Sequence, residues 1–441
     1  MVDGNVKSGR HGVAGRASWG VADQAVSSLT NFGLGLMVAR SVTPKAFGAF
    51  GIAFASYALV VNIGNGMISE PFLVRFSNAA IEDWRRAAAA ASGAAISVGL
   101  VAGAACLAFG LSSYGALAQS LLALALTLPG LVLQDTWRSL FFATRRGGMS
   151  FANDLLWAVT LGVALAVVIG TGHATVFWLV LAWGGSANVA AAFGALQART
   201  WPNPLRSLQW CREQRDLAVR FVGELLTLSG GQFLAIYTIG AIAGLVVVGG
   251  IRGAEMLLGP IYVMNFGVRA MAVPEAAASL RRSAAVMQRR LIILAGILTT
   301  AALVIGTVAS MLPDRVGVAL LGKSWEGARP AILPMALWMA ATGASISGRV
   351  GLRALAAASR SLRARLYTAP LIVVGAAAGA AIGGTRAAAL GMALGMVPDV
   401  VSTWWQLHLA VKEHLASTPG PVADDLVQVR SPVVTTEEDR T

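Results

Sequence analysis

Long apolar runs follow one another along most of this chain, and short stretches of Gly, Pro and charged residues separate them. A helix of about 20 mostly apolar residues is long enough to cross the roughly 30 Å hydrocarbon core of a bilayer. Since the runs have this length and end at turn-forming or charged residues, the pattern predicts twelve transmembrane helices, near residues 17–39, 47–70, 87–111, 116–137, 151–170, 175–198, 221–242, 246–272, 291–312, 330–352, 367–384 and 387–411.

The composition agrees with this interpretation. Of the 441 residues, 56% are apolar and only 12% are charged, and the mean hydropathy is +0.68. No soluble core needs so large an apolar fraction. The sequence therefore predicts an all-α integral membrane protein.

The distribution of positive charge predicts the orientation of the helices. A net charge of +13 would suggest a nucleic-acid partner in a soluble protein, but here the basic residues lie in short segments between apolar runs. Cytoplasmic loops carry the excess of Lys and Arg in membrane proteins. With both termini in the cytoplasm, few basic residues fall in the outer segments, namely Arg40, Lys45, Arg315, Lys323, Arg329 and Arg386. We therefore expect cytoplasmic termini and no nucleic-acid partner.

A basic connector at residues 199–220 divides the predicted spans into two groups of six. The boundaries are a cytoplasmic leader (1–16), an N-lobe (17–198), the connector, a C-lobe (221–411) and a polar, disordered cytoplasmic tail (412–441). A weak internal echo supports two related halves. Asp23 precedes Gly48, and Glu224 precedes Gly249, by the same number of residues, and each Gly opens the next span.

Four segments resemble the multidrug/oligosaccharidyl-lipid/polysaccharide exporter superfamily, and within it the bacterial polysaccharide flippases. Residues 39–50 (ARSVTPKAFGAF) are similar to the hairpin between spans one and two, and residues 141–148 (FFATRRGG) to the turn after span four. Residues 249–274 resemble the eighth span with its exit, and residues 320–328 (LLGKSWEGA) the outer turn before span ten. The likeness extends over most of the chain to about residue 411.

This resemblance implies a function as well as a fold. It implies two six-helix lobes around a central cavity lined by spans one, two, seven and eight. It also implies transport of a polyprenyl-linked oligosaccharide to the outer leaflet of the bacterial cytoplasmic membrane, with membrane lipids around the protein and a polysaccharide polymerase or glycosyltransferases as pathway partners. Lys45 and Ala46 depart from the acidic residues common there in the family. Spans thirteen and fourteen, found in peptidoglycan-precursor flippases, are absent from the predicted pattern.

Charged residues inside the predicted spans are candidates for function. An ionised side chain at the bilayer centre costs about 2.5–3.5 kcal/mol on insertion scales, so it needs a partner or a water-filled cavity. Arg252 and Glu255 share one helix face and can neutralise each other. Alternatively, Arg252 binds a phosphate of a lipid-linked sugar, because a planar guanidinium matches phosphate bidentately. Glu70 and Arg269, in the spans that the resemblance places around the cavity, are further candidates for binding the headgroup.

Two acids and one proline complete the predicted site. Asp23 and Glu224 lie on the inner halves of spans that we expect to face each other across the lobes, where they could hold H⁺ or Na⁺ for coupling. The alternative is a structural role through hydrogen bonds to nearby serines. Pro260 cannot donate to the helix ladder, so we expect a kink in span eight, either as part of a binding site or as simple curvature.

Other chemistry has little support in the sequence. The four His residues, at positions 11, 173, 408 and 414, lie away from any carboxylate cluster, the two Cys residues occupy different environments, and no Gly-rich phosphate loop ends in Lys-Ser/Thr. We therefore expect no metal site, no cofactor, no ATP hydrolysis and no enzymatic activity. The alternatives to a flippase are a multidrug or organic-cation antiporter of the same fold and, less well supported, a membrane glycosyltransferase.

Overall fold

The computed structural model describes residues 4–144 and 146–417, and over these ranges the chain is helical with no strand. Ten helical segments in the described ranges are long and apolar enough to cross a membrane, and a bent pair, α10 with the first part of α11, makes an eleventh. The prediction of an all-α, multi-pass membrane protein is confirmed. The first predicted span lies in a 38-residue helix, Gly4–Ser41, which is too polar to be counted among these ten.

The helices of the N-lobe follow the predicted spans closely. In order they are α1 (Gly4–Ser41), α2 (Pro44–Gly64), a π-helical turn (Asn65–Ser69), α3 (Glu70–Phe76), α4 (Ile81–Leu111), α5 (Gly115–Ala143), α6 (Gly147–Gly170) and α7 (Val176–Ala198). The π-helical turn joins α2 to α3, so that the three form one continuous span of 33 residues.

The connector and the C-lobe follow. The connector holds a 3₁₀ turn (Pro204–Arg206) and α8 (Ser207–Glu213), and the C-lobe consists of α9 (Arg215–Ile242), α10 (Leu245–Leu257), α11 (Gly259–Leu280), α12 (Ala284–Ser310), α13 (Asp314–Leu321), α14 (Trp325–Ala328), α15 (Ile332–Ala354), α16 (Ala358–Ile382) and α17 (Gly384–Ser417). Helix α17 extends a few residues into the segment predicted as a disordered tail, and the rest of that segment lies outside the described residues.

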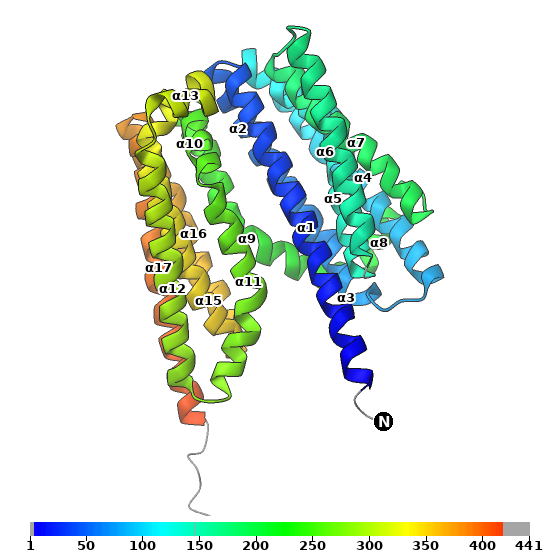
Figure 1. The fold of residues 1–441 in the computed structure, drawn as a ribbon, viewed down its shortest axis with the longest axis vertical. Coiled ribbons are helices and arrows are strands. Elements are labelled where there is room, and N and C mark those ends of the chain that lie inside the picture. The colour runs from blue at the N-terminus through cyan, green and yellow to red at the C-terminus, as the bar shows by residue number, and fades with distance from the viewer. Residues whose placement is uncertain (1–3, 145, 418–441) are drawn as a thin grey trace, which may run out of the picture.

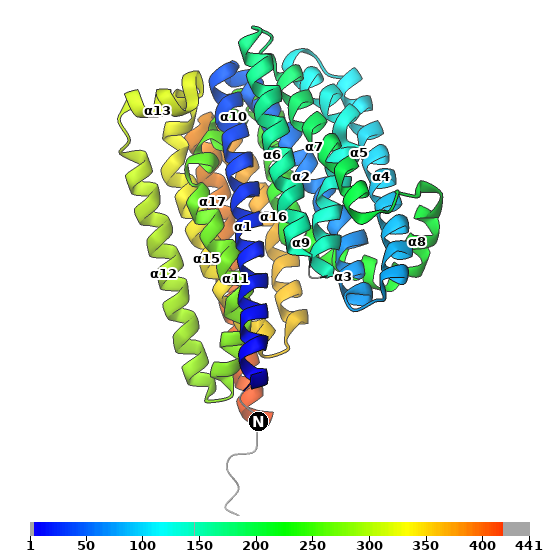
Figure 2. The same cartoon turned by 45° about the vertical axis from the view of Figure 1, so that its right-hand side comes forward.

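The two sets of helices form two bundles (Figure 1), which are in contact where α2 crosses α10 and where α9 packs along α2 and the π-helical turn. Helices α1 and α11 diverge toward the end of the molecule where the N-terminus and the end of α17 both lie. Turned by 45°, the same end carries the first turns of α1 and the last turns of α17 (Figure 2). The connector is fixed to the N-lobe, because the backbone N–H of Asn203 donates to the carbonyl of Ala89 at 2.9 Å.

Two glycines make the closest contact between the bundles, where α2 crosses α10. A Cβ atom added at Gly48 would lie 1.7 Å from the carbonyl oxygen of Leu245, and one added at Gly249 would lie 2.7 Å from that of Pro44. Small residues let transmembrane helices approach closely enough for extensive van der Waals contact. The two glycines that have equal spacing from Asp23 and Glu224 in the sequence therefore contact each other's helices across the lobes.

The span that carries Arg252 is broken. Helices α10 and α11 meet at an angle of 61° around Leu258, two residues before Pro260. The N–H of Leu258 closes α10 on the carbonyl of Ala254 at 3.1 Å, and Pro260 lies in the first turn of α11, where a proline needs no N–H donor. The bend places α10 against α2 and turns α11 toward α15.

Replacement of Gly48 by Leu tests the contact between the lobes. The new side chain cannot fit against the α10 backbone without moving the helix, and overpacking of this kind costs about 3 kcal/mol. We expect a clear drop in the melting temperature of the purified protein in detergent. Gly185→Leu is the matched control, because a Cβ at Gly185 meets nothing within 4 Å. Equal melting temperatures for the two variants would show that the crossing contributes nothing.

Candidate functional site

A polar cavity lies between the two bundles and consists of two adjoining chambers. The first, here called the basic chamber, has a volume of about 410 Å³ and is lined from α1 by Gln24 and Ser28 and from the C-lobe by residues that include Ser229, Gln232, Tyr262, Asn265, Trp338, Arg349, Arg353 and Arg365. The second, the deep chamber, has a volume of about 320 Å³ and is lined by Gly51, Phe54, Ala55 and Ala58 of α2 and by Gln232, Phe233, Ile236, Val248, Arg252, Glu255 and Tyr262. Gln232 and Tyr262 border both chambers. The lining comes from α1, α2, α9 and the broken span of α10 and α11, which are the four spans around which the resemblance implies a cavity, and also from α15, α16 and α17.

In the deep chamber, Arg252 and Glu255 form an ion pair with capacity for a further partner. Arg252 Nη1 lies 3.1 Å from Glu255 Oε2, and the guanidinium carbon lies 3.9 Å from the centroid of the Phe54 ring. Arg252 Nε and Glu255 Oε1 are buried and have no hydrogen-bond partner. The ring and one carboxylate oxygen therefore hold the guanidinium in place, and not all of its donors are used by hydrogen bonds within the protein.

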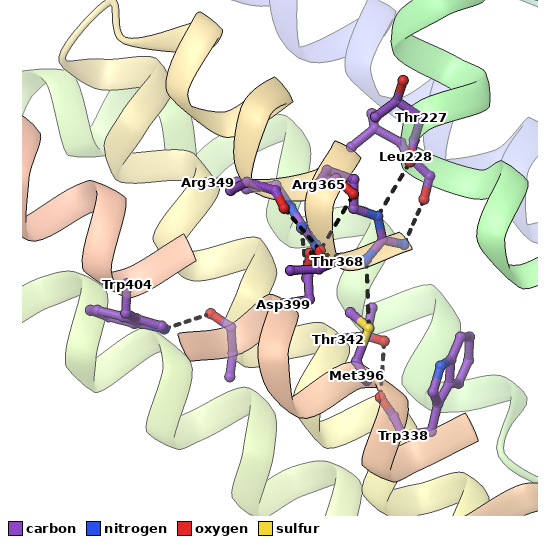
Figure 3. Close-up of polar contacts among 12 residues, drawn as sticks. Thr227, Leu228, Trp338, Thr342, Arg349, Arg365, Thr368, Met396, Asp399 and Trp404 are labelled. Atoms are coloured by element: carbon purple, nitrogen blue, oxygen red, sulfur yellow. Dashed lines mark hydrogen bonds and ion pairs between the residues drawn. The ribbon is translucent and has the colours of Figure 1, made fainter. Parts of the chain in front are cut away.

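Figure 3 shows a second group of charges beside the basic chamber, which we call the C-lobe cluster: Arg349, Arg365, Thr368 and Asp399. The Asp399 side chain is fully buried and accepts from Arg349 at 2.9 Å and from Thr368 at 2.9 Å, and Arg365 lies 3.1 Å away. Arg365 also donates to the backbone carbonyls of Thr227 at 3.3 Å and Leu228 at 2.8 Å, which ties α16 to α9. The C-lobe cluster thus has two arginines for one carboxylate, an excess of positive charge.

The N-lobe has the opposite imbalance, in what we call the N-lobe cluster: Asp23, Asp135, Arg138 and Asp154. Arg138 lies 2.9 Å from Asp23, 3.1 Å from Asp154 and 3.7 Å from Asp135. Gln134 donates to Asp154 at 2.8 Å. Three carboxylates from α1, α5 and α6 therefore surround one guanidinium. Asp23 Oδ1 is buried and has no hydrogen-bond partner.

The two clusters occupy corresponding positions. Arg138 lies five residues before the end of α5 at Ala143, and Arg349 lies five residues before the end of α15 at Ala354. Helices α5 and α15 correspond to the fourth predicted span of each half. The positions of Arg138 and Arg349 are thus a second similarity between the two halves, beside the equal spacing of Asp23–Gly48 and Glu224–Gly249.

The two candidate coupling acids, Asp23 and Glu224, each have an arginine partner in their own lobe. Asp23 binds Arg138, and Glu224 binds Arg353 at 2.8 Å. Glu70 lies within electrostatic reach of Glu224, and the side chain of Arg269 lies outside the described residues.

Asp154 and Arg365 are the members of the clusters that are hardest to identify from the sequence. Asp154 falls in the first turn of its predicted span, and Arg365 falls just before its predicted span, in an Arg-rich run typical of a cytoplasmic loop. The consecutive polar residues Asn153 and Asp154 at the start of an apolar run were a signal in the sequence. Both side chains are fully buried in the structure. No group of three His, Cys, Asp or Glu residues in the described ranges is suited to hold a metal ion.

No protein-family model matches the chain, and no curated protein matches it in sequence. Solved structures do match. An inward-facing multidrug resistance MATE family transporter of the MOP superfamily superposes with a TM-score of 0.70 and 13% identity, over 90% of this chain and 99% of that one. The lipid II flippase MurJ, in an inward closed conformation, superposes with a TM-score of 0.66 and 9% identity, over 91% of both chains. An outward-facing MATE family transporter gives a lower TM-score of 0.56, with 14% identity over 90% of this chain and 94% of that one.

At these identities the likeness defines the fold. The chain is a multi-pass membrane protein with the two-lobed helical fold of MOP superfamily transporters. The fold implied by the resemblance in the sequence is therefore confirmed.

Replacing Asp399 by Asn tests whether the C-lobe cluster depends on its buried charge. The substitution leaves two guanidiniums inside the lobe without their carboxylate, and breaking a buried ion pair costs about 3–5 kcal/mol. We expect a large loss of stability in denaturant unfolding of the purified protein.

The matched control is Glu413→Gln. Glu413 lies on α17, as Asp399 does, and pairs with Arg360 of α16, but its side chain is 67% exposed. An exposed pair contributes at most about 1 kcal/mol. If the two variants unfold at the same denaturant concentration, the buried cluster is not what holds α15, α16 and α17 together.

Proposed function

We propose that this protein is a transporter that moves the phosphate-bearing headgroup of a lipid-linked oligosaccharide across a bacterial cytoplasmic membrane by alternating access. The observation that carries the proposal is the Arg252–Glu255 pair in the deep chamber between the lobes. A charged, hydrated headgroup cannot cross hydrocarbon unaided, whereas a polar chamber shields it while its lipid tail stays in the bilayer.

The charge of the cavity favours an anionic ligand. The C-lobe cluster has more arginine than carboxylate, and Arg252 keeps an unpaired nitrogen. Guanidinium groups bind phosphate bidentately and stay ionised at all physiological pH values. MurJ, with which the chain shares its fold, is named as a lipid II flippase, a protein with a lipid-linked substrate.

The alternative function, that of an organic-cation antiporter, fits the same chamber less well. Such a ligand needs acidic groups and open aromatic faces. Here the Arg252 guanidinium already covers the Phe54 ring, and Glu255 is engaged with the same arginine. A membrane glycosyltransferase is also less favoured, because Asp23, Asp154, Glu255 and Asp399 are all held in ion pairs with arginine.

The arrangement of the lobes supports an inward-facing state. Gly48 and Gly249 form one close contact between the lobes, and α1 and α11 diverge from it toward the end that holds both ends of the described chain (Figure 1). The excess of Lys and Arg favours the cytoplasm for that end, and the TM-score is higher with the inward-facing than with the outward-facing transporter. Glycosyltransferases that build the headgroup and a polymerase that consumes it would be its pathway partners.

Arg252→Ala tests the headgroup site. Loss of one bidentate phosphate contact should lower the initial rate of transport at least tenfold, since a charge-assisted hydrogen bond contributes about 1.5–3 kcal/mol. Arg252→Lys should keep part of the activity. The measurement is the transfer of a fluorescent polyprenyl-diphosphate oligosaccharide across proteoliposomes.

The control for this experiment is Arg86→Ala, which removes an arginine whose side chain is 72% exposed and pairs with Asp83. It should transport at the wild-type rate. An Arg252→Ala variant with full activity would refute the proposed site. Transport of an organic cation such as ethidium, in place of the lipid-linked substrate, would favour the antiporter.

We further propose that the N-lobe cluster couples transport to protons. Three carboxylates around one guanidinium leave two negative charges uncompensated in a buried site, and protonation removes that cost. Arg138 occupies the position between the acids that a sodium ion would take. Protonation of Asp23 or Asp154 would weaken its ion pair with Arg138 and so loosen the contact of α1 with α5 and α6.

Asp154→Asn separates coupling from binding. The variant should still exchange labelled for unlabelled substrate across liposomes at equilibrium, but a proton gradient should no longer drive accumulation. Asp83→Asn, which changes an exposed acid of the N-lobe, should accumulate substrate normally. Accumulation by Asp154→Asn at the wild-type level, or accumulation driven by a sodium gradient alone, would contradict proton coupling at this cluster.

A further inference from the structure

An apolar groove runs along the outer surface of the C-lobe, between α9 and α16. It has a volume of about 700 Å³, and its walls include Leu226, Gly230 and Leu234 of α9 with Leu366, Pro370 and Val374 of α16. Leu59 of α2 borders it as well. Leu234, Leu366 and Val374 are each more than half exposed, so the groove opens to the lipid and not to another helix.

The groove leads into a charged pocket. This pocket, about 410 Å³ in volume, is lined by Arg220, Glu224, Arg353 and Arg365 and shares Thr227 and Leu366 with the groove. On its other side it shares Leu228, Arg353 and Arg365 with the basic chamber. The groove, the charged pocket and the basic chamber therefore adjoin one another, from the lipid-facing surface to the cavity between the lobes.

The length of the groove matches one leaflet. From Leu226 to Tyr237 the helix rises about 17 Å, at about 1.5 Å per residue, which is roughly half of the 30 Å hydrocarbon thickness. The charged pocket lies at the end of the groove nearest the start of α9, next to the basic connector. The far end is closed where the Tyr237 hydroxyl lies 3.1 Å from that of Ser56 on α2.

Charge determines which lipid suits the groove and the charged pocket. Arg220, Arg353 and Arg365 face the pocket, and the acids against them are Glu224, which binds Arg353, and Asp399, which binds Arg365. Asp399 is shared with Arg349, so the pocket keeps an excess of positive charge. Its shape and charge together fit a phosphate at one end and an apolar chain at the other.

We propose that the groove between α9 and α16 is a lateral loading site, which holds the hydrocarbon chain of the transported lipid while the charged pocket holds its phosphate. This inference rests on the proposed function and names the route by which the substrate reaches the cavity. Because Arg353 and Arg365 border both spaces, the phosphate can pass into the basic chamber while the chain remains in the groove.

A photoactivatable analogue of farnesyl phosphate, added to the full chain in liposomes, tests this site. Mass spectrometry of the crosslinked peptides should place the label on residues 226–237 and 366–374. Gly230→Leu should reduce that labelling at least fivefold, because a Cβ at Gly230 meets nothing within 4 Å and the side chain can fill the groove without strain. Gly162→Leu on α6, equally open at its Cβ, should leave the labelling unchanged.

The role of the phosphate is tested with the double variant Arg220→Gln/Arg353→Gln. Its labelling by farnesyl phosphate should fall to the level given by the farnesol analogue. Equal labelling of the wild type by the two analogues would mean that any lipid tail occupies the groove, and competition by phosphatidylglycerol as strong as that by farnesyl phosphate would mean a general phospholipid site. Either result overturns the proposal.

The outcome for the groove is separable from that for the proposed function. If Gly230→Leu transports and is labelled like the wild type, the loading site is refuted while transport stands. If the groove is labelled in a phosphate-dependent manner but Arg252→Ala transports normally, the loading site stands and the assigned headgroup site is refuted.

Discussion

The need to compensate ionised side chains inside a bilayer governs how each lobe is assembled. An unpaired ionised side chain at the bilayer centre costs about 2.5–3.5 kcal/mol on insertion scales and would destabilise the fold. In this protein the ionised side chains form clusters that join helices. Arg138 links α5 to Asp23 on α1 and Asp154 on α6, and Asp399 on α17 links α15 to α16. These contacts make each lobe a cohesive unit. In the proposed transport cycle each lobe would move as a unit, and the contacts between the lobes, such as the crossing of Gly48 and Gly249, would change.

The clusters are related in position and opposite in charge balance. Arg138 and Arg349 stand at corresponding points of the two halves, yet one is surrounded by three acids and the other shares a single acid with Arg365. The two lobes thus have two distinct environments at corresponding positions. An excess of carboxylate suits the storage of protons, and an excess of guanidinium suits an anionic ligand. In the proposed transport cycle the N-lobe cluster therefore binds protons, and the C-lobe cluster attracts the anionic ligand.

The sequence predicts the fold far better than it predicts the site. Apolar run length locates the membrane-spanning segments, because the bilayer imposes that length on each span separately. Even the contact at Gly48 and Gly249 leaves a trace in the equal spacing from Asp23 and Glu224. Ion pairing is different, because the partner lies on another helix at a sequence separation that nothing local specifies. Arg252 and Glu255 could be paired by their spacing. The arginine partners of Asp23 and Glu224 were not identified from the sequence, and Arg365 resembled a residue of a loop.

The location of the groove has a consequence for alternating access. Nearly all of its lining comes from α9 and α16, which Arg365 fastens together through the carbonyls of Thr227 and Leu228. Because both helices belong to the C-lobe, the groove would keep its shape when the lobes rock against each other. The contacts of α9 with the N-lobe, which include Leu59, the Tyr237–Ser56 hydrogen bond and the packing of Val222 against Gly66, are the ones that such a movement would break. The end of the groove at Tyr237 would then open, and the hydrocarbon chain of the lipid could follow its headgroup toward the other leaflet without leaving the bilayer.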